Sequence, residues 1–269
     1  MRKRDTPLVS VIIPTYNSAR TLSLALRSIK RQTYPSVEII VVDRHSRDGT
    51  PYIASSFGTR LMRADTERAE AKNIGLKAAK GRYVLFLDSD MELTPTVIQE
   101  CVELMERDPT IGAVVIPEIT IGNSLVAKIR RYERLHYENT YIESPRFYRK
   151  DLAIQAGGFD PEVVFYEEAT LAYKIEKMGY RRARSKSYIL HHEDDLSLME
   201  LIRKRYYYAH TFRIYATRYR EYANVQLNPS YRLRLFFKRS FWKYPHMALA
   251  VIIVKSLEYL STSLATVRK

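Results

Sequence analysis

Short apolar runs recur along the early part of the chain, and each run is followed by polar residues. Residues 8–14, 37–42 and 82–87 are almost wholly apolar and predict buried strands, while residues 59–63 predict a weaker strand. Helical patterns lie between these runs, over residues 18–32, from about residue 48, and over residues 67–80. Strands of this kind in alternation with helices predict an α/β fold, with a mostly parallel sheet covered by helices.

Three of these strands end in residues that can bind a ligand. Asn17 follows the first strand, Asp43 ends the second, and Asp88 and Asp90 follow residues 82–87. Parallel sheets bind ligands beyond the carboxyl ends of their strands, so these residues are expected to converge on one edge. In an extended segment residues i and i+2 point the same way, so Asp88 and Asp90 are expected to face a single target.

Two carboxylates at the end of a buried strand need a partner, because neighbouring carboxylates repel one another unless a cation lies between them. Oxygen ligands suit Mg²⁺ or Mn²⁺, which also binds phosphate oxygens. A turn or a helix cap is the other interpretation, but Thr94, followed by Pro95, is the expected N-cap of a helix to about Arg107. We therefore predict a divalent metal site at Asp88 and Asp90.

Positive charge is concentrated in the last quarter of the chain. Residues 200–269 hold 14 Lys and Arg against 3 Asp and Glu, a net charge of +11 out of +14 for the whole chain. The same residues are rich in tyrosine, and this mixture suits an anionic membrane surface or a nucleic acid. The single cysteine, Cys101, excludes an internal disulfide and a multi-cysteine metal site.

The C-terminal pattern predicts contact with a membrane. Residues 231–242 mix Arg and Lys with bulky aromatics, as interfacial helices do. Residues 247–267 are long enough to span a bilayer, although Lys255 and Glu258 interrupt them, and they could instead lie along the membrane or pack against a second copy. The expected division is a catalytic domain over residues 1–195, amphipathic interface helices over 196–244, and a transmembrane or membrane-embedded helix over 245–269.

Four segments carry a resemblance to a known family. VSVIIPTYN, VVDRHSRDGT, AKNIGLKAAKGRYVLFLDSD and GGFDPEVVFYEEATLAYKIEKMGY occur in this order. Together they resemble the inverting family 2 glycosyltransferases of the GT-A (Rossmann-like) fold. Among these, the chain is similar to small membrane-associated archaeal mannosyltransferases, dolichyl-phosphate-sugar synthases and cellulose-synthase-like enzymes. The resemblance implies a nucleotide-diphosphate-sugar donor.

The resemblance also implies roles for residues on the donor side. Contacts with the nucleoside are implied at Pro14, Tyr16 and Asp43, and metal ligands on the diphosphate at Asp88 and Asp90. Further contacts with the nucleotide sugar are implied at Asn17, Lys72, Ser89 and Arg205. The chain departs from the family at Lys72, where arginine is usual, and in the run VDRHSRDGT, where an acidic, glycine and serine run is usual.

An acceptor hydroxyl needs a base on the opposite face of the sugar, and the resemblance implies Glu168 for this role, with Glu167 next. Two glutamates that simply favour a helix N-terminus are the alternative. His191 is the expected third metal ligand and His192 the less favoured one. Arg205 either contacts the diphosphate or belongs to a solvated or lipid-facing basic stripe with Arg203 and Lys204.

The sequence therefore predicts a metal-dependent inverting hexosyltransferase at the cytoplasmic face of a membrane, since no signal peptide is visible. Its expected donor is GDP-mannose, with UDP-glucose next, and its expected acceptor is a hydroxyl of a lipid-linked glycan or glycolipid. A polyprenyl (dolichyl)-phosphate sugar synthase is the alternative. A basic nucleic-acid-binding protein without enzymatic activity is an alternative of a different class, and no nucleic acid is expected as a partner.

Overall fold

The computed structural model describes residues 6–194 and 196–267 and divides into two units, which are described separately here. The first unit comprises the chain up to Pro117, Ser144–Pro161 and Glu167–Leu190. The second comprises Glu118–Glu143, Glu162–Tyr166 and the chain from His191 onward. The boundary expected near residue 195 differs from this division, because Ile129 and Tyr132 pack in one core with Phe241 and Val251 of the C-terminal segment.

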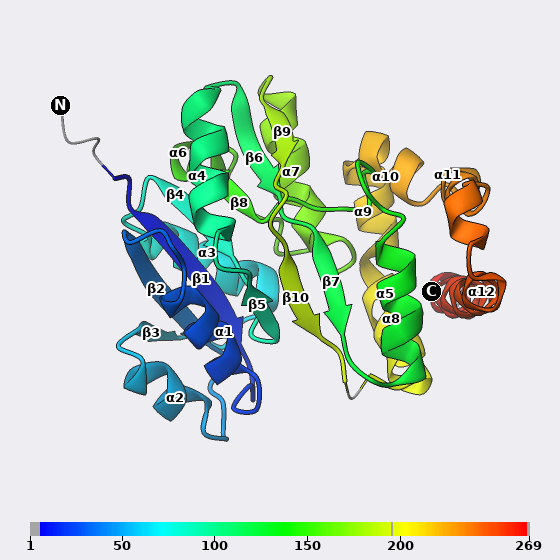
Figure 1. Cartoon of the computed structure of the whole chain (residues 1–269), viewed down its shortest axis with the longest axis horizontal. Helices are drawn as coiled ribbons and strands as arrows, with labels where there is room; N and C mark the ends of the chain where they lie inside the picture. Colours follow the sequence, from blue (N-terminus) through cyan, green and yellow to red (C-terminus); the bar gives the residue numbers. More distant parts are fainter. Residues whose placement is uncertain (1–5, 195, 268–269) are drawn as a thin grey trace. The chain divides into compact units, whose positions relative to one another are not determined.

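The first unit is built on a seven-stranded sheet in the order β3-β2-β1-β4-β8-β6-β9 (Figure 1). All neighbours pair in parallel except β8, which is antiparallel to both β4 and β6, so the prediction of a mostly parallel sheet is confirmed. The strands are β1 (Val9–Thr15), β2 (Val37–Asp43), β3 (Arg60–Arg63), β4 (Tyr83–Phe86), β6 (Ile111–Val115), β8 (Phe147–Arg149) and β9 (Arg181–Arg184).

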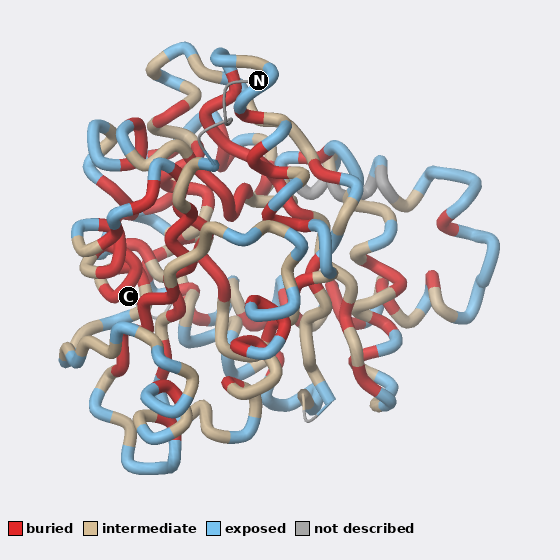
Figure 2. Tube along the Cα trace, turned by 60° about the vertical axis from the view of Figure 1, so that its left-hand side comes forward, coloured by how far each residue is buried: buried red, intermediate tan, exposed pale blue. Residues whose placement is uncertain are grey.

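Helices cover both faces of this sheet. Alternate residues of a strand point to opposite faces, so Val11 packs in one core cluster with Leu22 and Ile98, and Ile12 packs in another with Leu76 and Leu171. Buried segments run through the interior and exposed positions gather mainly on turns and loops (Figure 2). The helices are α1 (Leu22–Lys30), α2 (Thr50–Ser56), α3 (Arg68–Ala78), α4 (Val97–Arg107), α6 (Lys150–Gln155) and α7 (Glu167–Lys177).

The register places the residues predicted to bind a ligand at one edge of the sheet. Thr15, at the end of β1, pairs with Asp43, at the end of β2, and Ile12 pairs with Phe86 at the end of β4. The residues that follow these strands therefore meet at the same carboxyl edge, as the sequence predicts.

Two local predictions around Asp88 are wrong. Strand β4 ends at Phe86, and the amide of Met91 donates to the carbonyl of Asp88 (3.2 Å), so Asp88 begins a turn and is not followed by an extended segment. Helix α4 has its N-cap at Thr96 and not at Thr94. The hydroxyl of Thr94 instead donates to the carbonyl of Tyr188 (2.9 Å), which fixes the short strand β5 (Met91–Leu93) before the helix begins.

The second unit is mainly helical. It contains β7 (Glu118–Ile121), the end of β10 (Ile189–His192), α5 (Leu125–Arg134), α8 (Leu198–Tyr208), α9 (Phe212–Arg218), α10 (Arg220–Gln226), α11 (Pro229–Phe236) and α12 (Pro245–Val267). Short 3₁₀ helices lie at Ala209–Thr211 and Arg239–Trp242.

Residues 231–242, predicted to contact a membrane interface, are not one continuous helix, and their contact with a membrane stays a prediction. Helix α11 ends at Phe236, and the chain turns so that Phe241 is fully buried beside Tyr132. The indole of Trp242 donates to the carbonyl of Phe236 (2.6 Å) and closes this turn. In the described part of the chain, α12 is the one helix long and apolar enough to cross a membrane.

Candidate active site

Asp43 joins the loops that follow β1 and β2. Its carboxylate is fully buried and accepts hydrogen bonds from the hydroxyls of Thr15 (2.9 Å) and Ser46 (2.5 Å) and from the amide of Ser46 (2.9 Å). Asn17, which has a left-handed backbone (φ 48°), accepts from the amide of Arg47 (3.0 Å). The two loops are therefore held as one surface, and the contact of Asp43 with a nucleoside stays a prediction.

The run HSRDGT departs from the usual family pattern, yet it has a clear local role. Asp48 accepts from the amide of Ala19 (3.0 Å) and from the amide (3.0 Å) and hydroxyl (2.5 Å) of Thr50. The hydroxyl of Thr50, followed by the two amides among other contacts, lowers the pKa of Asp48. This carboxylate remains charged and pins the second loop to the first.

A cavity of about 220 Å³ opens beside these loops. Tyr16 lies at its rim with 61% of its surface exposed, and the Arg44 guanidinium lies 5.7 Å from the centre of the Tyr16 ring. An aromatic face beside a cation suits a planar, partly anionic ligand. The cavity is lined by Pro14, Thr15, Tyr16, Arg44, Thr66, Glu67, Arg68 and Ala71.

Lys72 is the buried centre of the site. Its ammonium lies 2.9 Å from Glu167, 3.4 Å from Glu168 and 3.9 Å from Asp88, and its side chain is 1% exposed. Burial alone lowers the pKa of a lysine, but Glu167, Asp88 and Glu168 outweigh this effect and raise the pKa of Lys72 above its usual value. Lys72 is therefore a fixed positive charge that draws three carboxylates together.

Arg146 is the second cation, and the sequence did not single it out. One guanidinium nitrogen lies 3.3 Å from Asp88 and the other lies 3.0 Å from Glu168. Arg146 reaches this place because β8 runs antiparallel to β4, so that the amide of Phe86 donates to the Arg146 carbonyl (2.9 Å). The predicted alternation of helices and parallel strands contained no such strand.

The two glutamates of α7 have different surroundings. Glu167 is 2% exposed and is paired with Arg68 (2.7 Å) as well as Lys72, whereas the side chain of Glu168 is 27% exposed. Of these two side chains, Glu168 therefore has the better access to an acceptor. Arg68 was also missed by the sequence analysis, since nothing in the helical pattern distinguishes it from other surface arginines.

Asn73 fastens the segment that carries the glutamates. Its side chain accepts from the amide of Phe159 (2.8 Å) and donates to the Phe159 carbonyl (3.0 Å). Gly158 adopts a left-handed conformation (φ 71°), and a Cβ atom there would lie 2.3 Å from the Asn73 side-chain oxygen. The motifs AKNIG and GGFD are therefore in contact through the side-chain amide of Asn73 and through Gly158, which leaves room for it.

Two of the remaining predicted site residues, Ser89 and Asp90, lie in the first unit. Ser89 donates to the hydroxyl of Ser18 (2.9 Å), which ties the turn after β4 to the loop after β1. Asp90 lies in the same turn.

His191 and Arg205 belong to the second unit. His191 Nδ1 lies 3.0 Å from Arg134 and 3.3 Å from Glu118, and the Arg205 guanidinium lies 3.6 Å from Glu258. His192 ends β10 in the same unit. Their predicted roles at the metal and the diphosphate stay predictions.

Comparison with known proteins identifies the family. A family model described as glycosyl transferase family 2 matches residues 10–160. WfgD of Escherichia coli, a UDP-Glc:alpha-D-GlcNAc-diphosphoundecaprenol beta-1,3-glucosyltransferase, is 31% identical over 138 residues, which are 49% of this chain and 54% of WfgD. Glycosyltransferase AglE of Haloferax volcanii is 39% identical over 93 residues, 31% of each chain. This chain therefore spans about half of the first relative and a smaller part of the second.

Solved structures show the same fold. A mannosyltransferase from Pyrobaculum calidifontis, in complex with GDP-Man and Mn²⁺, has a TM-score of 0.62 at 23% identity and covers 98% of this chain and 81% of its own. TarS of S. aureus in complex with UDP-GlcNAc has a TM-score of 0.57 at 17% identity and covers 96% of this chain and 90% of its own. The first unit has the α/β architecture of the GT-A fold. Because the family match covers more than half of the chain and contains Asp43, Lys72 and Asp88, the chain belongs to glycosyl transferase family 2.

Proposed function

We propose that this protein transfers a sugar from a nucleoside diphosphate sugar to an acceptor hydroxyl, with inversion at the anomeric carbon. The observation that carries the proposal is the cluster in which Lys72 and Arg146 each contact both Asp88 and Glu168. A carboxylate on the proposed diphosphate side and a carboxylate on the proposed acceptor side are held by the same two cations. Such fixed charges need no rearrangement when the anomeric bond breaks.

Asp88 and Asp90 supply donors of the right chemistry for a divalent ion. Mg²⁺ is usually bound by one or two carboxylates together with phosphate oxygens and water, and Mn²⁺ accepts the same ligands. Within residues 6–194 and 196–267 no group of three or more His, Cys, Asp or Glu side chains is arranged to hold a metal ion by itself, and a site completed by the substrate needs no such group. When bound, the ion would stabilise the negative charge that develops on the diphosphate. Lys72 and Arg146 orient Asp88 for this role.

Glu168 is the proposed general base. It is the more exposed of the two α7 glutamates, and the ion pairs with Lys72 (3.4 Å) and Arg146 (3.0 Å) fix the direction of its carboxylate. Glu167, buried between Arg68 and Lys72, holds the start of α7 in place. Direct attack by an activated hydroxyl on the side opposite the leaving group inverts the anomeric configuration.

The proposed donor is GDP-mannose, with UDP-glucose next, and the proposed acceptor is a lipid-linked glycan at the cytoplasmic face of a membrane. The Pyrobaculum calidifontis structure, which contains GDP-Man and Mn²⁺, supports the donor, and the diphosphoundecaprenol acceptor in the name of WfgD supports the lipid-linked acceptor. A polyprenyl phosphate acceptor is already anionic and needs no base. The accessible Glu168 therefore favours a hydroxyl acceptor over the synthase alternative.

A thermal-shift panel tests the donor site. The protein is heated with GDP-mannose, UDP-glucose or the free nucleosides, in the presence of Mn²⁺ or of EDTA. A ligand that binds only the folded chain stabilises it by about 2.7 kcal/mol at a hundredfold excess over Kd, so at least one nucleotide sugar should raise Tm in Mn²⁺. The proposal fails if no nucleotide sugar raises Tm under any of these conditions.

A further inference from the structure

Helix α12 buries its charged residues. Lys255 and Glu258 are the charged residues of α12 and are only 6% and 5% exposed. The Lys255 ammonium lies 2.7 Å from Glu258 and 2.7 Å from Glu133 of α5. Ser261, one turn further along, donates to the Ile202 carbonyl of α8 (3.0 Å). The polar side of α12 thus faces the other helices of the second unit.

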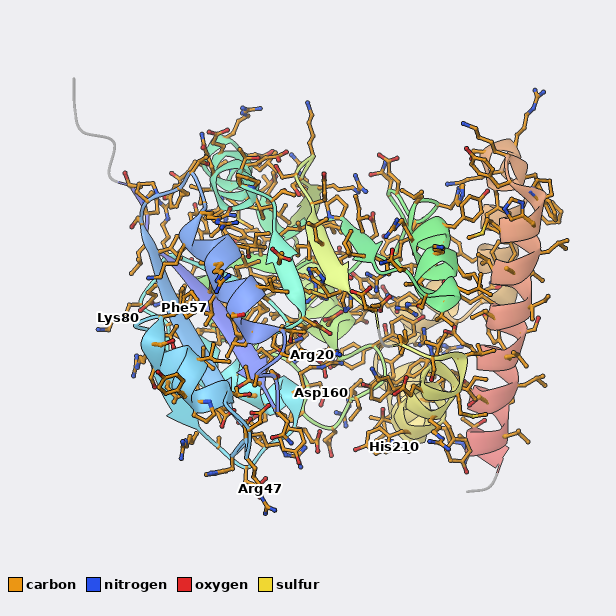
Figure 3. All side chains as sticks on the ribbon, turned by 60° about the horizontal axis from the view of Figure 1, so that its bottom comes forward. Arg20, Arg47, Phe57, Lys80, Asp160 and His210 are labelled. Atoms are coloured by element: carbon orange, nitrogen blue, oxygen red, sulfur yellow. The ribbon has the colours of Figure 1, made fainter. Side chains whose placement is uncertain are left out.

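The outer side of α12 is mainly apolar, with Ser256 and Ser263 as exposed hydroxyls on it. Leu249, Ile253, Leu260 and Leu264 recur at helical spacing and are 53%, 60%, 60% and 60% exposed. In Figure 3 one side of α12 faces the other helices of the second unit, and side chains project from its opposite side. A helix on a water-soluble surface normally has the reverse arrangement, with apolar residues inside and charges outside. The exposed stripe of α12, defined by these four residues, therefore requires an apolar environment.

Helix α12 is long enough to cross a bilayer, but its contacts do not suit a crossing. The Arg205 guanidinium of α8 lies 3.6 Å from Glu258, and Arg213 of α9 donates to the Thr266 carbonyl (3.0 Å) near the end of α12. A transverse α12 would either carry these cationic helices into the lipid core or leave Lys255 and Glu258 there without them. Charges at that depth are strongly unfavourable.

Exposed cations lie on α8, which packs against α12, and on the segment before α12. Arg203 and Lys204 are exposed on α8, and Lys238, Arg239 and Lys243 are exposed just before α12 begins. Residues 200–269 carry 14 Lys and Arg against 3 Asp and Glu. Basic side chains around an apolar helix face complement the anionic headgroups of a lipid surface.

We propose that α12 lies in the plane of a membrane, with the exposed stripe inserted among acyl chains and the neighbouring cations on anionic headgroups. The occupant of the stripe is thus a bilayer surface and not a second copy of the chain. This proposal extends the proposed function by specifying how a transferase with a lipid-linked acceptor meets its membrane. Its tests use neither donor nor acceptor, so a failure here leaves the proposed chemistry untouched.

Vesicle binding provides the first test. The full chain should sediment with phosphatidylglycerol vesicles more strongly than with phosphatidylcholine vesicles, and added salt should weaken this binding. The double variant Leu260→Asp/Leu264→Asp should lower the partition coefficient by roughly 10- to 100-fold, because charges replace two leucines that would insert among the acyl chains. The matched control Leu125→Asp/Leu135→Asp alters the first residue of α5 and the residue after its end, which are 68% and 60% exposed, and it should bind as the unchanged chain does. Equal binding by both double variants would overturn the proposal.

Labelling distinguishes the in-plane helix from a transmembrane one. Lys243→Cys, before α12, is at an exposed position, and Thr266→Cys, near its end, is at a half-buried position that faces away from the stripe because it lies two residues after Leu264; the native Cys101 is buried. In sealed inverted membrane vesicles both new cysteines should react with a membrane-impermeant maleimide without detergent. If one of them reacts only after detergent is added, α12 crosses the bilayer and the proposal is wrong. A dimer in lipid-free solution that Leu260→Asp/Leu264→Asp dissociates would also overturn it, because a second copy would then occupy the stripe.

Discussion

Lys72 and Arg146 carry most of the electrostatic argument at the scale of single residues. A buried lysine is stable in its charged form only if carboxylates offset its desolvation, and three of them lie within 3.9 Å of Lys72. The family usually has arginine at this position, and here Arg146 supplies the forked guanidinium next to the compact ammonium. Lys72 and Arg146 each contact both Asp88 and Glu168, so both cations fix the positions of these carboxylates.

Replacement of Glu168 tests the proposed base. Glu168→Gln keeps the size of the side chain but cannot accept a proton, so transfer should fall by roughly 10²- to 10⁴-fold while the donor Kd hardly changes. Turnover and donor titration measure the two quantities separately. Glu103→Gln, an exposed position on α4, is the control and should behave as the unchanged chain does. Full activity in Glu168→Gln would favour a phosphate acceptor and a polyprenyl phosphate sugar synthase.

Replacement of Glu167 should act on stability instead. Glu167→Gln leaves Arg68 and the buried Lys72 short of a partner, and loss of one member of a buried ion pair costs about 3–5 kcal/mol. Urea denaturation should therefore show a much larger loss for Glu167→Gln than for Glu168→Gln. If Glu167→Gln folds normally and loses more transfer than Glu168→Gln, the base is Glu167.

At the scale of elements, the contact between α3 and the segment before α7 depends on the close approach of the Asn73 side chain to Gly158. Gly157 and Gly158 both have positive φ (78° and 71°), but only Gly158 lies against Asn73, whereas a Cβ at Gly157 would meet nothing within 4 Å. The two glycines can therefore be compared directly. A side chain at Gly157 strains the backbone alone, whereas a side chain at Gly158 strains the backbone and also clashes with Asn73.

Alanine at each glycine separates these two effects. Gly157→Ala should cost about 1–2 kcal/mol for its left-handed backbone, and Gly158→Ala should cost about 1–3 kcal/mol more because Asn73 must move. Thermal or urea denaturation of the two variants measures the difference. Equal losses would mean that the Asn73 contact does not constrain this segment.

The ion cluster between α5 and β10 predicts a dependence of stability on pH. Burial raises the pKa of Glu193, but Arg130, Arg134 and His191 outweigh it and lower the pKa to about 2. Because the folded-state pKa is below the unfolded one, this stabilisation is complete above about pH 4.5 and is lost as pH falls toward 2. Glu193→Gln should lower stability at neutral pH by on the order of 3 kcal/mol and flatten the pH profile between 4.5 and 2. An unchanged profile in this variant would contradict the assignment.

The elements also show what the sequence could and could not predict. Strands β1 and β2 were predictable because most of their residues are apolar. The placement of Asp43 and Asp88 at one edge was predictable because the carboxyl ends of parallel strands lie together. The place of Arg146 was not predictable, because it depends on the antiparallel strand β8, and a run of three residues does not reveal the direction of a strand. The cap at Thr96 was also hidden, since the pairing of Thr94 with Tyr188 joins segments far apart in the sequence.

At the scale of the whole molecule, charge and chemistry are separated along the chain. The family motifs lie in the first unit except for Glu162–Tyr166, and the net charge of +11 lies in residues 200–269. Membership of glycosyl transferase family 2 favours the enzyme over the nucleic-acid-binding alternative. The sequence predicted the basic, apolar C-terminal region, but the inward placement of Lys255 and Glu258 depends on packing against α5 and α8 and could not be predicted from hydropathy.

The most direct test of the central claim is sugar transfer from GDP-mannose and UDP-glucose to polyprenol-diphosphate-linked saccharides, measured with Mn²⁺ or Mg²⁺ and again with EDTA. The account predicts that the unchanged chain forms an inverted glycosidic product with at least one donor, that EDTA abolishes turnover, and that Asp88→Asn and Asp90→Asn abolish it in the presence of metal. Turnover that persists in EDTA or in both aspartate variants would contradict the assignment of a metal-bound diphosphate to the end of β4.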